Sequence, residues 1–92
     1  EDFQRLEKEI CESLNVAVRT GEEPESEAGK RIAGLHKEWL CMTWKKYSVQ
    51  AHIGVVQMYT ADERFTKYYD SDVPGCAGFL KAAVEYWAAK LS

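Results

Sequence analysis

Residues 48–69, SVQAHIGVVQMYTADERFTKYY, decide the fold class of this chain. Apolar side chains recur there three and four positions apart, which is the spacing of one face of an amphipathic helix. Ser48 is placed to cap this helix, and Asp62 is placed to cap a second, shorter helix ending near Tyr69. On the first helix, one side is expected to carry Val49, His52, Ile53, Val56 and Tyr59.

The same spacing predicts helices over residues 2–20 and 25–45, and a last helix from the turn at residues 70–75 to about Lys90. Gly29 and Gly34 lie inside the second of these helices, where they permit close packing or ligand access. No window alternates like a strand. We therefore expect one all-α domain over residues 1–92, a compact unit of four or five helices.

The acidic N-terminal part differs from the rest of the chain. Residues 1–30 hold nine acidic and four basic side chains, whereas residues 31–92 hold six acidic and eight basic ones. Residues 22–27 form either a flexible connector or the acidic first turn of the next helix. We therefore divide the chain into an N-terminal helix with its connector, residues 1–29, and a helical core, residues 30–92.

Several classes of function are excluded by composition. There is no apolar run of the roughly 18 residues that cross a bilayer, and no dense basic stripe for binding DNA. Cys11, Cys41 and Cys76 are an odd, widely spaced set, which indicates buried free thiols in a reducing cytoplasm rather than a disulfide or metal site. Because the first residue is Glu1 and not Met, we expect a piece of a longer protein.

Aromatic residues gather in the second half of the chain. Of three Trp, five Tyr and three Phe, only Phe3 precedes residue 38. Each could simply be part of the core, but as a set they suit a partly open cleft, because rigid rings with polar tips supply contact area and hydrogen bonds to a guest. His52 could line such a cleft or be buried in the core, and for His36 a structural or surface role is expected.

Catalysis is not expected. Cys41 with His36 or His52 lacks a third orienting group, and Asp62 is already assigned as a helix cap beside Glu63. The glycines are too scattered for a phosphate loop. We predict no enzyme activity, no metal and no cofactor.

A chain of short motifs resembles the TipAS domain, the antibiotic-recognition part of certain MerR-family transcription activators. The matching segments are His36-Lys-Glu-Trp39, Tyr47-Ser48, His52-Ile53-Gly54, Met58-Tyr59, Asp62-Glu-Arg64-Phe65-Thr66, Tyr69, Pro74-Gly75 and Phe79-Leu80 with Ala83. They cover roughly residues 30–90. The resemblance implies a globin-like fold without haem and a groove for bulky hydrophobic antibiotics. It also implies that ligand binding orders the N-terminal part of the domain.

Covalent capture of a ligand is one property that the resemblance leaves open. Members that trap thiopeptides covalently use a cysteine between the two histidines, where this chain has Tyr47, and Cys41 lies about six residues earlier. We therefore expect reversible binding.

These observations lead to one functional hypothesis. The chain is expected to be the effector-sensing domain of a MerR-type regulator, which signals to a DNA-binding module outside this sequence. Its expected partner is a hydrophobic small molecule or peptide antibiotic. DNA, RNA polymerase and a second copy of the protein are reached only through the full regulator. No interaction with a membrane is expected. A drug-sequestering protein and a protein–protein interaction module are the alternatives. Phe65 is assigned to the core, and the ligand-binding candidates are Trp39, Trp44, Tyr47, His52, Tyr59, Tyr69 and Phe79.

Overall fold

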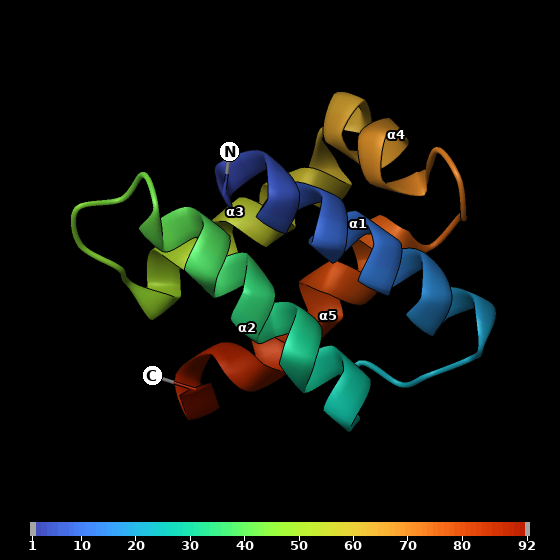
Figure 1. The fold of residues 1–92 in the computed structure, drawn as a ribbon, viewed down its shortest axis with the longest axis horizontal. Coiled ribbons are helices and arrows are strands. Elements are labelled where there is room, and N and C mark those ends of the chain that lie inside the picture. Colours follow the sequence, from blue (N-terminus) through green and yellow to red (C-terminus); the bar gives the residue numbers. More distant parts are fainter. Residues whose placement is uncertain (1, 92) are drawn as a thin grey trace.

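Five helices make up the computed structural model, which describes residues 2–91 (Figure 1). They are α1 (Asp2–Arg19), α2 (Glu27–Cys41), α3 (Val49–Ala61), α4 (Glu63–Asp70) and α5 (Cys76–Leu91). No strand occurs in the described part of the chain, so the prediction of an all-α domain is confirmed. None of these helices combines the length and apolar character needed to cross a bilayer.

Helix α5 is the centre of the packing. It contacts all four other helices, and α1 and α2 also pack on each other, side by side and antiparallel in Figure 1. Alanine and other small side chains let the neighbouring helices approach α5 closely. The buried side chains of α5 are Cys76, Ala77, Phe79, Leu80, Ala83, Val84 and Ala88.

The helix ends follow the predicted capping residues. The Ser48 hydroxyl accepts the Ala51 N–H at 3.3 Å, and the Asp62 carboxylate accepts the Arg64 N–H at 3.0 Å, as expected for N-caps. At the end of α1, Gly21 adopts φ +76°, and the Glu22 N–H donates to the Ala17 carbonyl at 2.9 Å. This arrangement is a Schellman turn, which favours glycine at the left-handed position.

The predicted end of the second helix was wrong. Helix α2 stops at Cys41 rather than near residue 45, and Met42, which lies within the predicted range, is 45% exposed. The backbone N–H of Trp44 donates to the Leu40 carbonyl at 2.8 Å, so the chain leaves the helix in a tight turn. Trp44 and Tyr47 consequently lie in the loop between α2 and α3.

The 22–26 connector is held against the core at Gly29. The Trp87 indole N–H donates to the Pro24 carbonyl at 3.1 Å, which ties the connector to α5. The Pro24 carbonyl also lies so close to Gly29 that a Cβ on this residue would overlap it. The absence of a side chain at Gly29 therefore allows the connector to cross α2, whereas the space beside Gly34 is open.

We expect Gly29→Ala to lower the unfolding free energy by about 1 to 3 kcal/mol, the usual cost of overpacking, because the methyl group displaces the connector. Gly34→Ala is the matched control. It should raise the unfolding free energy by up to about 1 kcal/mol through helix propensity alone. Urea denaturation measures both, and equal effects at the two positions would contradict the proposed contact.

Candidate functional site

Three of the predicted ligand-binding residues line one cavity. Trp39 of α2, Tyr59 of α3 and Tyr69 of α4 meet around a space of about 370 Å³. The rest of its lining is Glu7 of α1 and three residues of α4, namely Arg64, Phe65 and Tyr68. Four helices therefore contribute to one largely aromatic cavity.

The rings of this cavity are packed against one another. The Tyr59 ring lies 4.9 Å from Tyr69 and 5.3 Å from Phe65, measured between centroids. Phe65 packs against the core, as predicted, but it also lines the cavity. On the α2 side, Phe3 stacks on Trp39 at 4.9 Å, so α1 supports this wall.

The Trp39 indole nitrogen is buried and has no hydrogen-bond partner in the described residues. A buried donor without an acceptor typically costs about 1 to 3 kcal/mol. Such a group is rare in folded proteins. Trp39 lines the aromatic cavity, but its indole nitrogen is covered by protein atoms and does not open onto the cavity.

A second group of predicted residues forms a hydrogen-bonded chain that ends at the cavity. The Tyr47 hydroxyl lies 2.6 Å from His52 Nδ1, and His52 Nε2 lies 2.8 Å from His36 Nδ1. His36 Nε2 in turn lies 3.3 Å from the Tyr59 hydroxyl. The predicted residues Tyr47 and His52 are therefore connected to Tyr59 through His36.

His36 was assigned a structural or surface role in the sequence analysis, and the structure shows it fully buried. His52 is fully buried as well, which favours the core alternative for that residue. Burial, followed by the neighbouring His52 ring, lowers the pKa of His36 to about 3. Burial and the nearby Lys37 charge lower the pKa of His52 to about 4. Both imidazoles are therefore neutral near pH 7.

Two of the seven predicted residues lie away from the cavity lining and the hydrogen-bonded chain. The Trp44 ring lies 6.3 Å from Tyr47, on the α2–α3 loop. Phe79 is only 7% exposed and belongs to the hydrophobic core. Spacing along a helix could not distinguish Phe79 from a residue that lines a cavity, because both face inward.

The sequence analysis expected all three cysteines to be buried, but only one of them is. Cys76 is buried and its thiol lies 3.3 Å from the Asn15 side-chain oxygen, but Cys41 is exposed and Cys11 is partly buried. Burial raises the pKa of Cys76 to about 11, with the Asp70 charge adding to the shift. No group of three or more potential ligands for a metal ion occurs within residues 2–91.

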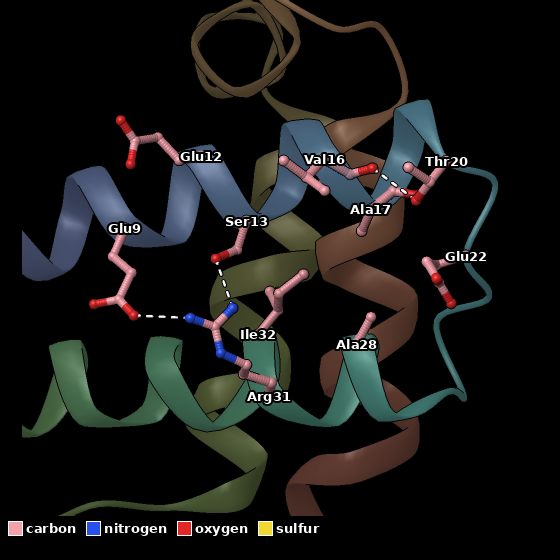
Figure 2. Close-up of a pocket in the computed structure, with 10 residues that line it drawn as sticks. All are labelled: Glu9, Glu12, Ser13, Val16, Ala17, Thr20, Glu22, Ala28, Arg31 and Ile32. Carbon is pink, nitrogen blue, oxygen red and sulfur yellow. Dashed lines mark hydrogen bonds and ion pairs between the residues drawn. The ribbon is translucent and has the colours of Figure 1, made fainter.

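A second cavity of about 350 Å³ lies between α1 and α2 (Figure 2). Apolar side chains, including Val16 and Ile32, form part of its wall. Arg31 projects across it and binds Glu9 at 2.9 Å and Ser13 at 2.9 Å. These interactions join α1 to α2 and occupy the guanidinium group, so the Arg31 charge is already paired.

The fold and this site define a small all-helical domain with an aromatic cavity between its helices. Residues 1–87 match the family model of the TipAS antibiotic-recognition domain. The chain belongs to this family. The match also includes the N-terminal third, which the motif resemblance over residues 30–90 did not reach.

Two curated relatives support this assignment. The chain is 30% identical over 87 residues to the HTH-type transcriptional activator TipA of Streptomyces coelicolor and to the protein of the same name from Streptomyces lividans. In each case the alignment covers 91% of this chain but 34% of the relative. The chain therefore spans about a third of the length of these activators. No solved structure matches, and the globin-like arrangement stays a prediction.

The two neutral histidines predict a specific pH dependence of stability. In the unfolded chain a histidine titrates near pH 6.5, so below that pH the unfolded state binds protons that the folded state excludes. The unfolding free energy should fall from pH 6.5 towards pH 5, with a slope of up to about 1.4 kcal/mol per pH unit for each histidine. Urea denaturation at pH 7, 6 and 5 measures this slope, and a constant unfolding free energy would contradict it.

Proposed function

We propose that this domain recognises a bulky, largely apolar ligand at the aromatic cavity, as the effector-sensing part of a transcriptional regulator. The observation that carries the proposal is the aromatic lining of this cavity, in which rings from α2, α3 and α4 converge. Tyr59, Tyr69 and Phe65 would provide the apolar contacts of a guest, with Trp39 on the α2 side.

The cavity volume limits how much of a ligand it encloses. At about 370 Å³ it lies at the small end of the roughly 300 to 1,000 Å³ of small-molecule sites. A large peptide antibiotic would therefore place one ring system inside and leave the rest across the rim. Exposed side chains at this rim, Tyr68 and Arg64, are available for those outer contacts.

Helix α1 gives the ligand a means of signalling. It supplies Glu7 to the cavity, and the Tyr68 hydroxyl donates to the Glu7 carboxylate at 2.6 Å. It also supplies Phe3, which stacks on Trp39. In the docked state, α1 packs against the other helices. A guest that contacts both α1 and α4 would bind this state more tightly than one in which α1 is detached, and so would increase its population. In the full regulator this shift would pass to a DNA-binding module.

The relatives are named as HTH-type transcriptional activators, and the family is named for antibiotic recognition. We infer that in the cytoplasm the complete protein contacts DNA and RNA polymerase, and pairs with a second copy, through segments beyond this chain. We also infer that the domain binds its ligand without catalysing a reaction. The exposed Cys41 is separate from the lining of the aromatic cavity, which favours reversible binding there.

Trp39→Phe tests the proposed site, because it keeps an aromatic ring on Phe3 but removes part of the cavity wall. A panel of thiopeptides should bind this variant about 5- to 30-fold more weakly, the loss of apolar contact worth about 1 to 2 kcal/mol. The unfolding free energy should stay equal or rise, since an unsatisfied buried donor disappears.

Trp44→Phe is the matched control, because Trp44 lies on the α2–α3 loop, outside the cavity lining. It should leave affinity unchanged in the same fluorescence titration. Equal affinity of both variants, or binding that is lost only when Trp44 is changed, would show that the ligand site lies elsewhere.

A further inference from the structure

The polar groups behind the cavity form a continuous chain from the molecular surface to the ligand site. It starts at the partly exposed Tyr47, passes through His52 and His36, and reaches Tyr59 in three successive contacts of 2.6, 2.8 and 3.3 Å. The Tyr69 ring packs on Tyr59 with the centroids 4.9 Å apart, so the chain ends at the cavity wall. Each link is a group that can either donate or accept.

Neutral imidazole carries one N–H and one bare nitrogen, so it donates on one side only if it accepts on the other. A series of such groups must therefore run in a single direction. In the inward direction, which runs from the surface to the cavity, Tyr47 donates to His52, His52 donates to His36, and His36 donates to Tyr59. In the opposite direction every one of these bonds is reversed.

We propose that the direction of this chain follows the ligand, so that the Tyr59 end at the cavity presents a donor to one guest and an acceptor to another. This inference rests on the proposed ligand site. In the inward direction the Tyr59 hydroxyl accepts from His36 and is free to donate into the cavity. In the reverse direction its proton is used on His36, and its oxygen accepts a hydrogen bond from the guest.

The reversal leaves the charge and the number of protons unchanged. Both imidazoles carry their proton on Nε2 in the inward direction and on Nδ1 in the reverse direction. Each phenol keeps one proton and turns its O–H bond. The two histidines are fully buried, and all four ring nitrogens contact other members of the chain. One imidazole therefore cannot change its tautomer without the other.

The surroundings favour a neutral chain. Lys37 lies at the outer end over the Tyr47 ring, with its ammonium group 4.7 Å from the centroid. A positive charge there opposes protonation of the imidazoles. The cavity thus contains one group that can either donate or accept, which suits a permissive site.

Two single-atom variants test the reversal without any ligand. Tyr47→Phe removes the acceptor that the outer N–H of His52 needs, so both histidines should become Nε2–H tautomers. Tyr59→Phe removes the acceptor for the inner N–H of His36, so both should become Nδ1–H tautomers. Nitrogen NMR of the imidazole rings at pH 7 distinguishes these forms, and circular dichroism verifies that each variant is folded.

The decisive signal comes from the histidine that each substitution does not touch, which is His36 in Tyr47→Phe and His52 in Tyr59→Phe. Tyr86→Phe on the exposed side of α5 is the control and should match the parent protein. Opposite tautomers at both histidines in the two variants support the proposal. The same tautomers in both variants, or a positively charged imidazole at pH 7, overturn it.

Two small aromatic probes then test the dependence on ligand. Quinoline presents an acceptor and should shift both histidines to Nε2–H, whereas indole presents a donor and should shift both to Nδ1–H. If both probes perturb Tyr59 but leave the tautomers unchanged, the reversal is wrong and the ligand site stands. If neither probe perturbs the cavity residues at millimolar concentration, the proposed site fails and the ligand-driven reversal with it.

Discussion

The contact between His36 and His52 is the constraint on which the arrangement of α2, α3 and the cavity depends. Two polar rings are fully buried, and each would cost about 1 to 3 kcal/mol if its N–H group lost its partner. They are satisfied only if α2 and α3 keep the register that brings Nδ1 of one within 2.8 Å of Nε2 of the other. The same register places Tyr59 beside His36, and so fixes one wall of the cavity.

Helix α4 extends this constraint to the rest of the site. The Thr66 hydroxyl donates to the Tyr59 carbonyl at 2.6 Å, which fastens α4 to the end of α3. The Asp62 cap makes the sharp change of direction between these helices possible. Phe65, Tyr68 and Tyr69 are consequently presented to the same space as Tyr59. Local capping and one side-chain hydrogen bond thus position four aromatic rings.

The helices and their caps could be predicted from the sequence because they depend on neighbours three or four residues apart. Ser48 and Asp62 are clear examples. The aromatic content after residue 38 led to the prediction of a cleft, and Trp39, Tyr59 and Tyr69 do line one cavity. The buried state of His36 could not be predicted, because it depends on His52, which lies sixteen residues away on another helix. The end of α2 was missed for a related reason: Met42 continues the apolar spacing, but the turn at Leu40 removes it from the helix.

Helix α1 lies outside the motif resemblance over residues 30–90, yet it contributes to both cavities. Its first turns supply Glu7 to the lining of the aromatic cavity and Phe3 to the support of Trp39, and its later turns form one wall of the cavity shown in Figure 2. Polar contacts also join it to other helices, namely Arg31 with Glu9 and Tyr68 with Glu7. Exposed ion pairs of this kind contribute only about 0 to 1 kcal/mol each. The docking of α1 therefore depends mainly on its apolar face, Leu6, Ile10 and Leu14. A guest between α1 and α4 would add contacts at a place where α1 makes few contacts with other helices. Ligand binding at the cavity would therefore stabilise the packed, ordered position of this helix.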